Sequence, residues 1–170
     1  MPQEKNTLYF GDNLSKEYDN EGERNHRINV RPSKRTFENL DGNAVESLGY
    51  SHSGGAFYNL DIHHNKVTNA VGHGVMLNAF DSQPNVITYN STIHDNTLLL
   101  TAGMSVGPLK SCTINDNTID HTSNWRGYGI YLYKGSNGVS MDGNKISDTE
   151  QADYYYKGST DIHINGKKVA

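Results

Sequence analysis

The sequence has little cysteine, no long apolar run and a small net charge. Its one cysteine, Cys112, cannot form an internal disulfide, which excludes a disulfide-stabilised scaffold and a metal site built from several cysteines. No stretch approaches the roughly 18 consecutive apolar residues of a membrane-spanning helix. A net charge of −4 argues against nucleic acid as a partner, because phosphate binding depends on lysine and arginine. The first residues also lack the apolar segment of a secretory signal peptide.

Asparagine and glycine dominate the polar composition instead. The 170 residues include 20 asparagines, 17 glycines and 11 tyrosines, while only 20% are charged. Asparagine and glycine adopt left-handed backbone conformations at the lowest cost, so the chain is expected to contain many turns and no long helix. The length predicts one domain, covering residues 41–170. We interpret the more highly charged residues 1–40 as an irregular N-terminal cap or connecting segment.

A short pattern recurs in the chain: apolar, x, apolar, x, x, Asn, x, apolar. Its copies are Leu60–Val67, Thr92–Leu98, Cys112–Ile119, Val139–Ile146 and Ile162–Val169; the second lacks the first apolar residue and the last has lysine in place of asparagine. Glycine-led segments follow the first three copies, at Gly74–Leu77, Gly103–Val106 and Gly129–Leu132. Each unit therefore predicts two or three short strands separated by turns, which is typical of a solenoid.

The repeated asparagines, Asn65, Asn96, Asn117 and Asn144, have a structural explanation in such a solenoid. We expect each to form a sharp bend, since asparagine tolerates positive φ, and to hydrogen-bond to its equivalent in the next turn, about 4.8 Å away. An unpaired buried amide would cost about 1–3 kcal/mol, so a ladder of bonded amides is favoured. Cys112 occupies a core-facing position of the same pattern.

The motif Ile-x-x-Asn-x-Ile, alternating with Gly-x-Gly-Ile-x-Leu, resembles right-handed parallel β-helix proteins. These include pectate-lyase-like enzymes, alginate epimerases and phage tailspike depolymerases. The resemblance implies an all-β, single-stranded right-handed parallel β-helix, a solenoid of about five to six coils. No polar cap is evident over the last coil, so we expect a fragment or an end covered by an oligomer partner. Because the ladder is scaffold, the resemblance is specific for the fold and weak for function.

In this family, polysaccharide usually lies along one sheet, which we assign to the glycine-led strands. The outward row there is Met76, Ser105, Tyr131 and Tyr155, and Tyr133 continues it. Tyrosines suit a sugar polymer, because rings stack on sugars while phenol groups hydrogen-bond. The alternative is that tyrosine simply favours exposed strand positions.

Two insertions, residues 78–90 and 120–128, border this sheet. The second holds Trp125 beside Arg126. This pair suits an acidic sugar, because the Trp125 ring can stack on the sugar while the Arg126 guanidinium pairs with its carboxylate. The alternative is that Trp125 packs on the edge of the coil. Asp81 lies in the first insertion, near the predicted groove.

His73 lies between two glycines at the start of this sheet. It is a candidate general base or acid, and the alternative is that it is a turn residue without a chemical role. If the protein is an enzyme, we expect lyase or epimerase chemistry. His73 or Tyr131 would exchange the proton α to a carboxylate, and Arg126 would stabilise the developing charge.

His63 and His94 form an outward polar column on a different sheet, with His64 and Asp95 beside them. A metal could be held there, but a solvated polar face is favoured because no fixed ligand spacing closes a site. We therefore predict no metal site and no cofactor. Calcium remains open without an identified ligand cluster.

The sequence favours binding, and as a further option processing, of an extracellular acidic polysaccharide. No nucleic-acid or membrane partner is expected. The alternative is a non-catalytic segment of a phage tail spike, surface fibre or adhesin, docked as a homo-oligomer (a trimer) or against further coils of a longer chain. Either function implies an extracellular or virion-associated location.

Overall fold

The computed structural model describes residues 8–10, 25–26, 33–47, 55–77, 86–120 and 127–170. These residues form strands and turns without a helix. Within these ranges, therefore, no helix has the length and apolar character needed to cross a membrane. Three residues of the predicted site, Asp81, Trp125 and Arg126, lie outside the described ranges.

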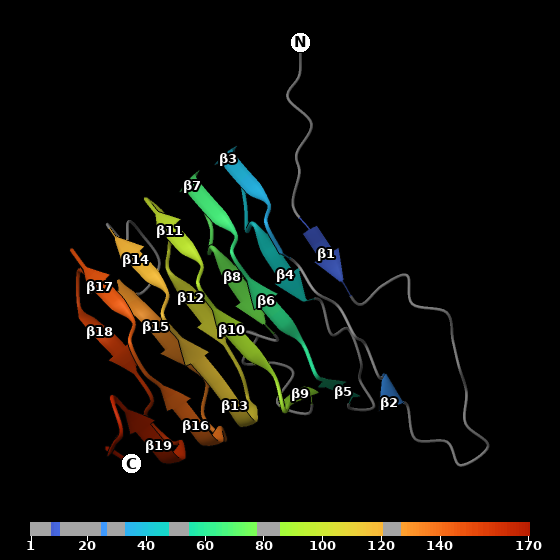
Figure 1. The fold of residues 1–170 in the computed structure, drawn as a ribbon, viewed down its shortest axis with the longest axis vertical. Helices are drawn as coiled ribbons and strands as arrows, with labels where there is room; N and C mark the ends of the chain where they lie inside the picture. Colours follow the sequence, from blue (N-terminus) through green and yellow to red (C-terminus); the bar gives the residue numbers. More distant parts are fainter. Residues whose placement is uncertain (1–7, 11–24, 27–32, 48–54, 78–85, 121–126) are drawn as a thin grey trace.

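Three sheets run along the length of the solenoid, and each turn of the chain adds strands to them (Figure 1). Sheet A consists of β1 (Leu8–Phe10), β4 (Val45–Ser47), β8 (Val75–Leu77), β12 (Met104–Val106), β15 (Tyr128–Leu132) and β18 (Ala152–Tyr155). Sheet B consists of β2 (Asn25–His26), β5 (Gly55–Tyr58), β9 (Val86–Tyr89), β13 (Leu109–Asn115), β16 (Asn137–Met141), β19 (Thr160–Ile164) and β20 (Lys167–Lys168), with β6 (Asp61–His63) and β10 (Thr92–His94) beside them. Sheet C consists of β3 (Thr36–Leu40), β7 (Lys66–Ala70), β11 (Thr97–Leu99), β14 (Thr118–Asp120) and β17 (Lys145–Ser147).

Equivalent residues of the repeat stack in register from turn to turn. In sheet C, Val67 pairs with Leu98, which pairs with Ile119. All three are 0% exposed and belong to one continuous core inside the coil. Among the described residues, every strand pair is parallel except β19 with β20. The parallel solenoid predicted from the repeat is therefore confirmed, and Cys112 lies in its core as expected, where burial raises the pKa of its thiol.

The asparagine ladder is also confirmed. The side-chain amide of Asn65 donates to Oδ1 of Asn96 at 2.9 Å, Asn96 donates to Asn117 at 3.0 Å, and Asn117 donates to Asn144 at 3.0 Å. The backbone N–H groups of the first three donate to the same oxygens at 3.0–3.1 Å. Each rung thus satisfies one side chain and one backbone donor.

The expectation that these asparagines take positive φ is wrong. The left-handed residue is the one before each asparagine: His64 (φ 55°), Asp95 (φ 53°), Asp116 (φ 54°) and Gly143 (φ 67°). That residue makes the bend, so the asparagine after it can turn its amide into the coil. The ladder residue is selected for hydrogen bonding, and the residue before it for backbone conformation.

Strand pairing extends to both ends of the described stack. β3, at the end of the predicted N-terminal segment, pairs with β7, while the division of the chain at residue 40 stays a prediction. At the other end, β20 folds back antiparallel on β19, with His163 opposite Lys168. This hairpin covers the last edge of sheet B with two exposed lysines, so the end that the sequence predicted to be uncapped is closed on that sheet.

Candidate functional site

The outward row of sheet A has the predicted register. Met76 pairs with Ser105, Ser105 with Tyr131, and Tyr131 with Tyr155. The neighbours of these residues along each strand point inward, because strand side chains alternate between faces. The inward neighbours are Val75, Leu77, Met104, Val106, Ile130 and Leu132, all 0% exposed.

Three half-buried tyrosines form a contiguous aromatic patch at the last two strands of sheet A, which we call the tyrosine surface: Tyr128, Tyr131 and Tyr155. The rings of Tyr131 and Tyr155 are parallel, with centroids 4.3 Å apart and an angle of 6° between planes. Tyr128 lies beside both, 5.7 Å from Tyr131 and 5.0 Å from Tyr155. Aromatic side chains of successive turns thus make one surface; the sequence predicts Tyr131 and Tyr155 in it and missed Tyr128.

The other members of the predicted column are not open to solvent, which corrects the expectation of a continuous outward binding column. Met76 is 7% exposed, Ser105 is 2% exposed and Tyr133 is 8% exposed. Tyr133 packs with Met76, and Tyr131 packs against both. Because Tyr133 is buried, it offers little surface to a ligand, and its role in substrate binding stays a prediction.

Glu46 extends the row beyond Met76, and sequence reasoning missed it. Glu46 pairs with Met76 and is 8% exposed. Nδ2 of Asn43 lies 3.0 Å from Oε2 of Glu46, to which it donates, and 3.1 Å from the sulfur of Met76. The signal that could have found it is the parallel between Gly42-Asn-Ala-Val45 and Gly72-His-Gly-Val75.

His73 lies in the turn before β8, against Asn43 of the preceding turn. Its backbone N–H donates to Oδ1 of Asn43 at 2.7 Å, and its Nδ1 is 3.3 Å from the same oxygen. The flanking glycines have internal explanations. A Cβ at Gly72 would meet Oδ1 of Asn43 at 2.4 Å, and one at Gly74 would meet the side chain of Leu98 at 2.5 Å. Neither glycine therefore indicates a close-approaching ligand.

The structure does not bring His73 and Tyr131, two of the three predicted catalytic residues, together. β8, which follows His73, is separated from β15, which carries Tyr131, by β12. Two strand spacings amount to about 10 Å. Arg126 lies outside the described residues. The catalytic roles of His73, Tyr131 and Arg126 therefore stay predictions, and only Tyr131 belongs to the tyrosine surface.

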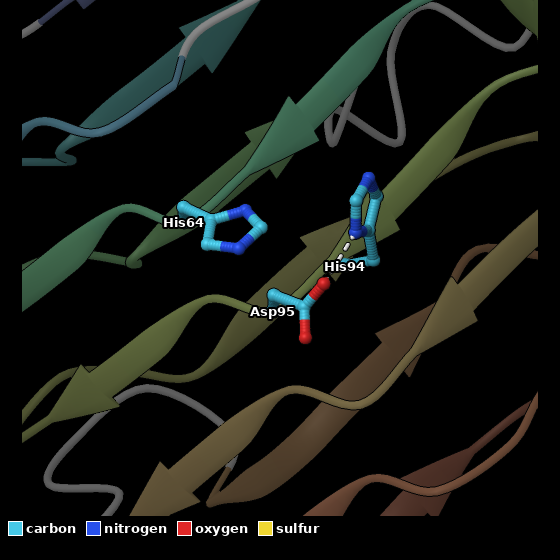
Figure 2. A group of neighbouring side chains, drawn as sticks. All are labelled: His64, His94 and Asp95. Carbon is cyan, nitrogen blue, oxygen red and sulfur yellow. Dashed lines mark hydrogen bonds and ion pairs between the residues drawn. The ribbon is translucent and has the colours of Figure 1, made fainter.

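A second group of side chains lies on sheet B, at the turn after β6 and β10. His64, His94 and Asp95 each place a nitrogen or oxygen atom within 4.8 Å of the others, and Figure 2 shows them turned toward one another. Nδ1 of His94 lies 2.7 Å from Oδ2 of Asp95, and its Nε2 lies 3.1 Å from Oδ1 of Asp61. Nδ1 of His63 is 2.9 Å from Nδ1 of His64.

The carboxylates perturb the titration of this group. Burial lowers the pKa of His94, but the hydrogen bonds and negative charges of Asp95 and Asp61 outweigh it, so the pKa lies above its ordinary value. The hydrogen bond from His94 in turn lowers the pKa of Asp95. Imidazole nitrogens and carboxylate oxygens are ligands for divalent transition metals, so His64, His94 and Asp95 are the residues here that could hold an ion.

A family model for the right-handed β-helix region matches residues 18–169. The chain belongs to the right-handed β-helix family. Comparison with curated proteins and with solved structures found no match. Family membership confirms the predicted fold and its handedness, and it assigns no chemistry to this β-helix.

The sequence predicted only some members of the tyrosine surface and of the histidine–aspartate group on sheet B. The repeat places Tyr131 over Tyr155, and His63 beside His94, because the register follows from the ladder. The burial of Tyr133 had no signal in the sequence. The same register places His64 and Asp95 at one turn position of adjacent turns, but the spacing of 31 residues between Asn65 and Asn96 does not reveal the left-handed backbone that both adopt there.

Proposed function

We propose that this β-helix binds a polysaccharide at the tyrosine surface of sheet A. The observation that carries the proposal is the contiguous packing of Tyr128, Tyr131 and Tyr155, which all remain partly exposed. Elsewhere on the described outward row, Glu46, Met76 and Ser105 are buried. A ligand that reaches this sheet therefore meets an aromatic area at β15 and β18.

The packing of the rings determines how a sugar would be held. Parallel stacking of Tyr131 on Tyr155 hides their facing surfaces from any ligand. Ring edges and phenol groups remain, with Tyr128 beside them at an angle of 47° to Tyr155. Hydrogen bonds from the phenols to sugar hydroxyls, together with apolar contact along the ring edges, suit a chain of pyranose rings lying across the strands.

We further propose that the polysaccharide is a uronate polymer and that the protein acts on it as a lyase or an epimerase. Arg126 supports it, because a guanidinium pairs with a sugar carboxylate in bidentate geometry. Replacing Arg126 by glutamine is expected to weaken binding of uronate polymers and to leave neutral polymers unaffected. Ultraviolet absorbance of unsaturated products reports lyase activity separately from binding.

The binding test compares two stacked tyrosine pairs on different sheets. Tyr58 and Tyr89 stack on sheet B with centroids 5.0 Å apart and planes at 11°, so Tyr58→Ala is a matched control for Tyr155→Ala. Calorimetric titration with a panel of uronate-containing and neutral polysaccharides is expected to show saturable binding. Tyr155→Ala should weaken it about tenfold, equivalent to about 1.4 kcal/mol, and Tyr58→Ala should not. Equal losses in both variants, or no binding by the unmodified protein, would refute the proposal.

The structural alternative, a rigid segment of a fibre or adhesin, rests on one feature of the last turn. Ile146, Ile164 and Val169 pack on the core there but remain only partly buried. A second copy of the chain could cover them. Native mass spectrometry that shows a stable trimer, together with no saturable polysaccharide binding, would favour this function over carbohydrate recognition.

A further inference from the structure

We propose that His64, His94 and Asp95 form a binding site for a divalent transition-metal ion of the Zn²⁺ type. The site lies on sheet B and is independent of the tyrosine surface. Its three ligand atoms lie within 4.8 Å of one another, and Figure 2 shows the three side chains together. Two imidazoles and one carboxylate form a ligand set used by zinc sites that keep a further position for water.

The register of the coil creates the site. His63 on β6 pairs directly with His94 on β10, so the residues that follow them, His64 and Asp95, occupy the same turn position in adjacent coils. Both adopt the left-handed conformation, with φ of 55° and 53°. Adjacent strands lie about 4.8 Å apart, so equivalent side chains meet. A slip of one residue in this pairing would separate the ligands.

The distances fit an ion after small side-chain rotations. Zn²⁺ binds nitrogen and oxygen at about 2.0–2.2 Å, so tetrahedral ligand atoms lie about 3.3–3.6 Å apart. Nδ1 of His94 and Oδ2 of Asp95 are 2.7 Å apart, joined by a hydrogen bond. An ion would replace the shared proton and move these atoms about 0.6–0.9 Å farther apart. The side chains of His94 and Asp95 are 29% and 46% exposed, so an ion can reach them from solvent.

A carboxylate behind His94 supports the assignment. Nε2 of His94 lies 3.1 Å from Oδ1 of Asp61 on the neighbouring strand. Donation from Nε2 to this carboxylate leaves the Nδ1 lone pair for the ion, the arrangement by which histidine ligands are commonly oriented. The ring of His63 stacks on His94 with centroids 5.0 Å apart and planes at 5°, which further restrains its rotation. Asp61 and His63 are therefore positioning residues.

The chain offers a matched control on the same sheet. His163 and Asp161 form a comparable imidazole–carboxylate pair at 3.3 Å. Among the described residues they have no second imidazole or further carboxylate close enough to make a group of three. His163→Ala thus removes one half-buried histidine without affecting the proposed site.

The test is calorimetric titration of the whole chain with Zn²⁺ at neutral pH, supported by visible absorbance of the Co²⁺ form. The variants are His94→Ala, Asp61→Asn and His64→Asn; the last retains a residue that tolerates positive φ, so the turn is preserved. We expect one Zn²⁺ per chain, loss of saturable binding in His94→Ala and His64→Asn, about 10–100-fold weakening in Asp61→Asn, and unchanged binding in His163→Ala. Zn²⁺ should also raise the melting temperature of the unmodified protein, because the three ligands come together only in the folded chain.

Circular dichroism confirms that each variant retains its sheet content. Absence of saturable binding in the unmodified protein would show that these histidines form only a solvated polar face. Binding that is retained in both His94→Ala and His64→Asn would place the ion elsewhere. Either result would overturn the proposal, and neither would affect polysaccharide binding on sheet A.

Discussion

Replacing Asn117 by alanine removes the central rung of the ladder. Asn117 is 0% exposed. Its Oδ1 accepts from the backbone N–H and the side-chain amide of Asn96, both at 3.0 Å. Its Nδ2 lies 3.0 Å from each of three acceptors, Oδ1 of Asn144 and the carbonyls of Ile93 and Asn115. Alanine would leave this set of partners without the side chain that joins them.

The expected destabilisation follows from the groups that lose a partner. The Asn96 backbone N–H lies inside the coil, and an unsatisfied buried donor costs about 1–3 kcal/mol. The side-chain amide of Asn96 keeps its bonds to the carbonyls of Ile62 and His94, so it loses only one of its three acceptors. The removed side chain also leaves a small void. We expect Asn117→Ala to lower the free energy of unfolding by about 3 kcal/mol, a large part of a typical 5–15 kcal/mol. For a chain of this size the melting temperature should fall by about 6–12 °C.

Urea unfolding followed by circular dichroism measures this change, and Asn137→Ala is the control. Asn137 is exposed on β16, where its amide donates to Oγ1 of Thr160 at 2.9 Å. Its replacement should change the free energy of unfolding by less than about 0.5 kcal/mol. If Asn117→Ala is no more destabilising than Asn137→Ala, the ladder does not stabilise the coil and the reasoning is refuted.

Two further predictions concern a crowded glycine and an exposed ion pair. Gly103→Ala should lower the free energy of unfolding by about 3 kcal/mol in urea titrations, because φ is +70° and a Cβ would lie 2.4 Å from the carbonyl oxygen of Gly129. The control is Gly166→Ala, which should cost only about 1 kcal/mol because φ is similar, at +71°, and nothing lies within 4 Å of the added Cβ. Equal costs in the two variants would show that crowding at Gly103 does not affect stability. The pKa of Asp161 is lowered by its hydrogen bonds to Lys168 and His163. A lowered folded-state pKa gives stability that is present above the unfolded pKa and is lost as pH falls through the folded value. Lys168→Ala should therefore raise the pKa of Asp161 in an NMR titration, and an unchanged pKa would show that the pair does not form in solution.

The repeat was sufficient to predict the core and the stacking register. Alternating apolar residues specify which side chains point inward, and the recurring asparagine specifies how one turn lies on the next. These two constraints placed Tyr131 over Tyr155 without any knowledge of the loops. The left-handed residue was misplaced by one position, because a motif shows which residues recur but not which of two neighbours makes the bend.

Properties that depend on several turns together could not be predicted. Tyr133 is buried because it packs with Met76, which lies about 57 positions earlier in the chain and two strands away. The group formed by His64, His94 and Asp95 needs both turn geometry and side-chain direction. The roles of Asp81, Trp125 and Arg126 depend on insertions that the repeat does not constrain.

The central claim is that buried amides hold successive turns in register and thereby decide which outward side chains meet. Hydrogen exchange of the asparagine side-chain amides, followed by NMR, tests it most directly. Asn65, Asn96 and Asn117 are at most 2% exposed, and their Nδ2 protons are predicted to exchange far more slowly than those of exposed Asn137. Exchange of all four amides at the same rapid rate would contradict the account.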